Sequence, residues 1–156
     1  MQNWLDAYGE SHQNPTNKTI HWWCVPSIFF SIVGLLSLIP LPNFGLFGAG
    51  WEPYLHVGTL LIIYGVIFYL RLSRSIAIGM LIVSAFILYG VKWVNLNLED
   101  IRLFVYLGIF VIAWIVQFVG HKIEGKKPSF IDDIKFLLIG PAWLLHFIYR
   151  KLGINY

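Results

Sequence analysis

Long apolar segments are the feature that most restricts how this chain can fold. A helix needs roughly 17 to 25 mostly apolar residues to cross a hydrocarbon core about 30 Å thick. Four segments meet this requirement: 22–39, 54–70, 76–94 and 103–119. Because 58% of the 156 residues are hydrophobic and only 12% are charged, a soluble domain could not bury all the apolar side chains. The sequence predicts an all-α, multi-pass transmembrane helical bundle with four spans.

A fifth apolar segment, Phe136 to Tyr149, is shorter and contains Gly140-Pro141. Proline removes a backbone donor and disfavours helix at the residue before it. We therefore expect a short, broken C-terminal helix pair that lies at the membrane interface or re-enters the membrane.

The distribution of Lys and Arg predicts the orientation of the spans. The loop 41–53 carries neither residue, whereas basic residues follow the second and fourth spans, and short cytoplasmic loops are enriched in them. We expect one integral membrane domain, 1–156, with a cytoplasmic cap formed by 1–21 and 120–156. The net charge of +3 is too small and too scattered for a nucleic-acid surface.

The histidines become informative once this topology is assumed. His12, His21, His121 and His146 fall on the predicted cytoplasmic side, and His56 falls on the opposite side, where a role at a helix end is the simpler interpretation. Between the first two, Asn14-Pro15 is typical of a helix start. A short helix that ends near His12, followed by a turn and a second helix, could bring His12 and His21 together.

A second polar group extends the fourth predicted span. Gln117, His121 and Glu124 lie on one face of a helix, Gly125 is a plausible C-cap, and Ser129 to Asp132 resembles a capping box for the tail helix. Several imidazoles that converge with a carboxylate are what an open non-haem metal site needs. Glu124 could equally be a metal ligand or pair with the basic residues that follow it, Lys126 and Lys127.

Specific motifs in the chain resemble the Mpo1-like family over about residues 6 to 153. They are His12-Gln-Asn-Pro-Thr-Asn-Lys-Thr-Ile-His21 followed by Val25-Pro26, Trp114-Ile-Val-Gln-Phe-Val-Gly-His121, Lys126-Lys-Pro128 and Pro141. The chain looks like the bacterial branch, so the resemblance implies a bacterial inner membrane. The same resemblance implies an iron(II)-dependent dioxygenase of fatty-acid α-oxidation, as in the yeast member, which shortens a 2-hydroxy fatty acid by one carbon. It also implies that His12, His21 and His121 are the metal ligands and the catalytic residues.

The chain departs from the family at the fourth ligand position. The family often has a glutamate four residues after the third histidine and another in the tail helix. Here Glu124 follows His121 by three residues, and the tail has His146-Phe147. Either Glu124 or His146 could be the fourth ligand.

The resulting hypothesis is a dioxygenase that uses Fe(II), O2 and a long-chain 2-hydroxy fatty acid taken from membrane lipid, with no nucleic acid and no obligate protein partner. Asn17 or Gln117 would orient the metal ligands, and Lys126 or Lys127 would bind the substrate carboxylate. Two other classes remain open: a non-enzymatic lipid-binding or structural membrane protein, and a zinc-dependent lipid hydrolase. Haem ligation fits the positions of the histidines less well.

Overall fold

The computed structural model describes residues 2–125 and 136–156, and the regular elements in these residues are all helices. No strand occurs in them, and the only β-type pairing there is an isolated bridge between Pro40 and His56. The helices, in chain order, are α1 (Gln2–Gly9), α2 (Pro15–Ser37), the 3-10 helix η1 (Ala49–Tyr54), α3 (Val57–Leu72), α4 (Arg74–Asn97), α5 (Arg102–Glu124) and α7 (Ile139–Leu152).

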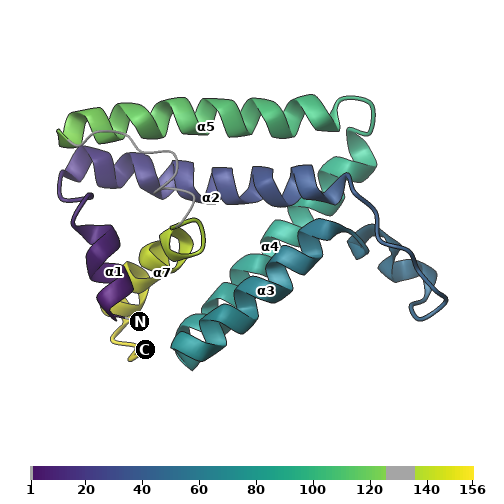
Figure 1. Cartoon of the computed structure of the whole chain (residues 1–156), viewed down its shortest axis with the longest axis horizontal. Coiled ribbons are helices and arrows are strands. Elements are labelled where there is room, and N and C mark those ends of the chain that lie inside the picture. Colours follow the sequence, from purple (N-terminus) through teal and green to yellow (C-terminus); the bar gives the residue numbers. More distant parts are fainter. Residues whose placement is uncertain (1, 126–135) are drawn as a thin grey trace.

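Two pairs of helices form the frame of the molecule. The helices α2 and α5 lie side by side, α3 and α4 form a second pair set at an angle to the first, and α7 lies between the two pairs (Figure 1). Short α1 packs against α7 on the side away from α3 and α4 (Figure 1). Residues near both ends of the chain are thereby brought next to the first half of α2.

The start of α2 agrees with the predicted cap. Asn14 is extended, and its Oδ1 accepts hydrogen bonds from the backbone N–H groups of Thr16, at 2.9 Å, and Asn17, at 3.4 Å. Pro15 occupies the first helical position, where its missing N–H has no cost. The helix therefore begins seven residues before the expected apolar span, and this polar extension carries His21.

Close contact between α2 and α5 depends on a glycine. A Cβ atom built on Gly120 of α5 would lie 2.4 Å from Oδ1 of Asn17 in α2. Small residues let helix backbones approach in membrane proteins. The two helices can therefore place their side chains against each other at the level of His21 and His121.

Within residues 2–125 and 136–156, three helices are long and apolar enough to cross a membrane: α2, α4 and α5. The expected second span, 54–70, differs from the structure, because α3 has only 16 residues and would measure about 24 Å at 1.5 Å per residue. Tyr54 is instead the last residue of η1, and Leu55 and His56 lead from η1 into α3. Large apolar side chains remain exposed along α3, α4 and α5, as expected for surfaces that face lipid.

The C-terminal helix also differs from the expectation of a break at Gly140-Pro141. Pro141 lies in the first turn of one continuous helix, α7, where proline is tolerated because those N–H groups need no intrahelical partner. Most of α7 is buried, including Ala142, Trp143 and Leu144. The proposed capping box Ser129 to Asp132, which would begin the other half of the pair, lies outside the described residues.

Candidate metal centre

Three histidines from separate parts of the chain meet in the interior. His12 lies in the connection between α1 and α2, His21 in α2, and His121 near the end of α5. The ring centroids of His12 and His21 are 4.2 Å apart, those of His12 and His121 are 5.3 Å apart, and those of His21 and His121 are 5.0 Å apart. All three side chains are buried, with exposed fractions of 2%, 0% and 4%.

Backbone carbonyl groups orient two of the rings. Nδ1–H of His12 donates to the carbonyl oxygen of Tyr8, at 2.6 Å, and Nδ1–H of His21 donates to that of Asn17, at 2.9 Å. A carbonyl oxygen can only accept, so Nδ1 carries the proton and Nε2 carries the lone pair in each ring. Metal-binding histidines characteristically donate their second ring nitrogen in this way.

The arrangement fits a transition-metal ion. One ligand nitrogen from each of the three rings lies within 4.8 Å of the other two. Nitrogens that bind one ion at about 2.1 Å lie at most about 4.2 Å apart, so a slight adjustment would let the rings share an ion. Nε2 of His21 is buried and has no hydrogen-bond partner in the described part of the chain, which a bound cation would explain. Three imidazoles suit iron or zinc and leave coordination positions open for reactants.

Glu124 takes part in a hydrogen-bonded network beside the three histidines. Its carboxylate accepts from the backbone N–H groups of Gln13 and Asn14, both at 2.8 Å, and from Nδ2 of Asn17, at 3.0 Å. It is not a member of the histidine group that could hold a metal. These contacts fasten the connection carrying His12 to the end of α5, where Gly125 forms the expected C-cap with a φ of 75°.

The other histidines lie elsewhere. Nδ1 of His56 accepts from the N–H of Thr59, at 3.2 Å, and so caps α3, as the simpler interpretation expected; burial lowers its pKa. His146 of α7 is hydrogen-bonded through Nδ1 to the hydroxyl of Tyr156. Burial, followed by the positive charge of Arg150, lowers the pKa of His146. His146 does not join the group of three histidines, and the positions of Lys126 and Lys127 lie outside the described residues.

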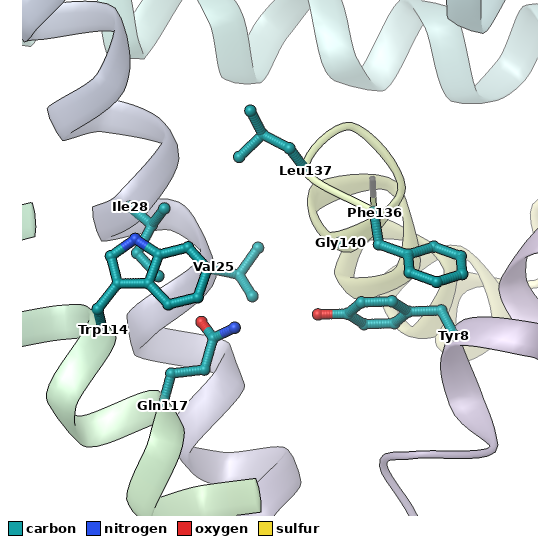
Figure 2. Close-up of a pocket in the computed structure, with 8 residues that line it drawn as sticks. All are labelled: Tyr8, Val25, Ile28, Trp114, Gln117, Phe136, Leu137 and Gly140. Atoms are coloured by element: carbon teal, nitrogen blue, oxygen red, sulfur yellow. The ribbon is translucent and has the colours of Figure 1, made fainter. Parts of the chain in front are cut away.

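A small cavity lies beside the segments that carry the three histidines. We call it the Gln117 cavity. Its open volume is about 20 Å³, which is room for one group the size of a water molecule. Figure 2 shows the Gln117 amide facing the Tyr8 hydroxyl across it. Its lining residues are Tyr8, Val25, Ile28, Trp114, Gln117, Phe136, Leu137 and Gly140.

The cavity touches each histidine-bearing segment. Tyr8 precedes His12 by four residues, and its ring stacks on the imidazole with centroids 4.2 Å apart and planes 17° from parallel. Val25 follows His21 by one helical turn, and Gln117 precedes His121 by one turn. Asn17 contacts His21 through its backbone and Glu124 through its side chain. Tyr8 had not been predicted as a site residue, although its position one turn before His12 was the available sequence signal.

Comparison with known proteins identifies the family of this chain. A family model described as "2-hydroxy-palmitic acid dioxygenase Mpo1-like" matches residues 1–152. A protein of Saccharomyces cerevisiae, "2-hydroxy-palmitic acid dioxygenase MPO1", is 30% identical over 161 residues, which cover 98% of this chain and 82% of the yeast protein. No solved structure gives a significant match. Together with the three converging histidines, the matches show that this chain belongs to the Mpo1-like family of 2-hydroxy-palmitic acid dioxygenases.

Proposed function

We propose that this protein is an iron(II)-dependent dioxygenase that shortens long-chain 2-hydroxy fatty acids by one carbon. The observation that carries the proposal is the convergence of three buried imidazoles, two of them held by backbone carbonyls. Membership of the Mpo1-like family and the name of the yeast relative support the substrate class. Three neutral nitrogen ligands would hold a divalent ion and leave room for small reactants.

The roles of the residues follow from their positions. His12, His21 and His121 would bind the ion, and a bound Fe(II) would supply the redox chemistry with which O2 cleaves the bond between C1 and C2 of the acid. The overall reaction balances without another reductant: one 2-hydroxy acid and one O2 give the acid one carbon shorter, CO2 and water. The burial of the three rings keeps bulk water from the reacting groups.

The membrane would deliver the substrate. Long acyl chains partition into lipid, and the exposed apolar faces of α4 and α5 would lie in the same layer. We propose that Lys126 or Lys127 binds the substrate carboxylate near the headgroups, and that both chain termini and the metal site face the cytoplasm of a bacterial cell. A Lys126→Gln, Lys127→Gln double variant would then raise KM for the acid and leave the iron content unchanged.

The first experiment measures metal content and turnover together. Protein purified without oxygen in lipid nanodiscs is expected to carry about one iron per chain. Addition of 2-hydroxypalmitate should consume O2 and release CO2 and pentadecanoate in equal amounts. Protein that contains no metal and stays inactive after Fe(II) is added would refute the proposal. Protein that contains zinc and hydrolyses a lipid without consuming O2 would also refute it.

Two histidine variants make the test specific to the site. His21→Ala removes one of the three converging rings and should abolish both iron binding and O2 uptake. His56→Asn also removes an imidazole, but asparagine is a good N-cap, so the start of α3 is preserved. This control should keep the wild-type iron content and turnover.

A further inference from the structure

An unsatisfied amide oxygen marks the Gln117 cavity. Gln117 is only 3% exposed, and its Oε1 has no hydrogen-bond partner among the residues that the structure describes. A buried polar atom without a partner is costly and uncommon in native proteins. Such an atom on a side chain that lines a cavity indicates that a ligand group completes the hydrogen bond.

The cavity restricts what that group can be. It has room for one water-sized group and not for an acyl chain. Much of its wall is apolar, from Val25, Ile28 and Leu137. Gln117 in its wall precedes His121 by one helical turn, so an occupant lies close to the segments that carry the three histidines. The occupant is therefore a small polar group attached close to the reacting carbons.

Hydrogen-bond chemistry selects among the reactants. Oε1 of an amide only accepts hydrogen bonds, so its partner must donate one. O2 has no hydrogen, and the carboxylate of a fatty acid is ionised at neutral pH and can only accept. The 2-hydroxyl group is the donor that distinguishes the proposed substrate from an ordinary fatty acid.

We infer that Gln117 recognises the 2-hydroxyl group of the acid in this cavity and thereby makes the enzyme select 2-hydroxy over unsubstituted fatty acids. This inference rests on the proposed function, because it assigns the specificity of that same site. A substrate without the hydroxyl leaves the Gln117 oxygen buried and unpaired, which lowers the affinity for that substrate.

The test measures binding rather than turnover. Iron-loaded protein in nanodiscs, kept free of O2, is titrated with 2-hydroxypalmitate and with palmitate, and binding is followed by the change in tryptophan fluorescence. Trp114 lines the cavity and serves as a reporter. Wild-type protein should bind the 2-hydroxy acid about 5- to 10-fold more tightly, the ratio that one hydrogen bond of ordinary strength provides. In Gln117→Met, which keeps the side-chain length but lacks the acceptor, the ratio should fall to about one.

A matched control changes the same cavity without touching the acceptor. Ile28→Val removes one methylene from the wall and should alter the affinities for both acids by a similar factor, so that their ratio stays at the wild-type value. Iron content is measured in every variant, because an inability to bind iron would signal damage to the site rather than lost recognition.

A substrate analogue tests the inference without any variant. 2-Fluoropalmitate carries a small polar group that cannot donate a hydrogen bond, so wild-type protein should bind it no more tightly than palmitate. Tight binding of the fluoro acid, or an unchanged ratio in Gln117→Met, would overturn the role of Gln117 and point to a bound water as the partner of Oε1. Absence of iron and O2 uptake in wild-type protein would instead refute the dioxygenase proposal itself.

Discussion

Replacing Glu124 with alanine is expected to weaken metal binding about 100-fold, even though the structure places this carboxylate outside the histidine group. Three hydrogen bonds end on Glu124, two from the backbone of Gln13 and Asn14 and one from Asn17. At this partly exposed position, water can replace lost partners, so each bond is assigned about 1 kcal/mol, the value of an ordinary hydrogen bond and below the range for charged acceptors. Together they stabilise the ordered connection that carries His12 by about 3 kcal/mol, which corresponds to roughly 100-fold in affinity if that connection must be ordered to bind the ion.

The assay is a competition titration of the metal-free protein with Fe(II) or Co(II) against a chelator of known affinity. Glu124→Gln should lie between wild type and alanine, because its amide keeps one acceptor oxygen. Glu99, another carboxylate, lies at the opposite end of α5 in the connection from α4, and Glu99→Ala should leave the affinity unchanged. An affinity loss below about threefold in Glu124→Ala would refute the reasoning. Complete loss of metal in both Glu124 variants, with no change in thermal stability, would instead identify Glu124 as a ligand.

Three further predictions concern the site and the helix pair around it. His121→Ala should abolish iron loading and turnover while the protein still expresses and unfolds cooperatively; full activity would exclude His121 from the site. His146→Ala should keep about one iron per chain, and a metal-free variant would make His146 a ligand. Gly120→Ala should lower the midpoint of thermal unfolding by an amount equivalent to about 1–3 kcal/mol, because the new Cβ would collide with Asn17. Gly108→Ala, on the same helix with no atom within 4 Å of the new Cβ, should instead stabilise α5 by about 0.5–1 kcal/mol, and equal effects of the two changes would contradict this account.

Local signals in the sequence predicted the parts of the site that depend on single helices. Asn14-Pro15 marked the start of α2 and therefore the turn that brings His12 back to His21. The spacing between Gln117 and His121 placed both on one face of α5. The prediction that the three histidines converge rested on placing both helix ends on the same side of the membrane, which the apolar segments and the basic residues predicted together.

Features that depend on contacts between helices could not be predicted in this way. The sequence predicted Glu124 as a ligand or an ion-pair partner. Its role as a hydrogen-bond acceptor could not be predicted, because the donors are backbone N–H groups more than 100 residues away. The short length of α3 was not predicted either. An apolar composition cannot show that Tyr54 belongs to η1 and that His56 pairs with Pro40. Similarly, Pro141 predicts an interruption, but only the packing of α7 shows that the helix begins before it.

The separation of the three histidines along the chain sets the order of events during biosynthesis. His12 and His21 leave the ribosome early, whereas His121 and its helix follow about a hundred residues later, a delay of roughly 5 to 20 s at ordinary rates of synthesis. During that interval α2, α3 and α4 are made with an incomplete ligand set. Under the proposed function, a complete metal site therefore forms only after α5 has been made, and a chain truncated before α5 would lack the third ligand, His121.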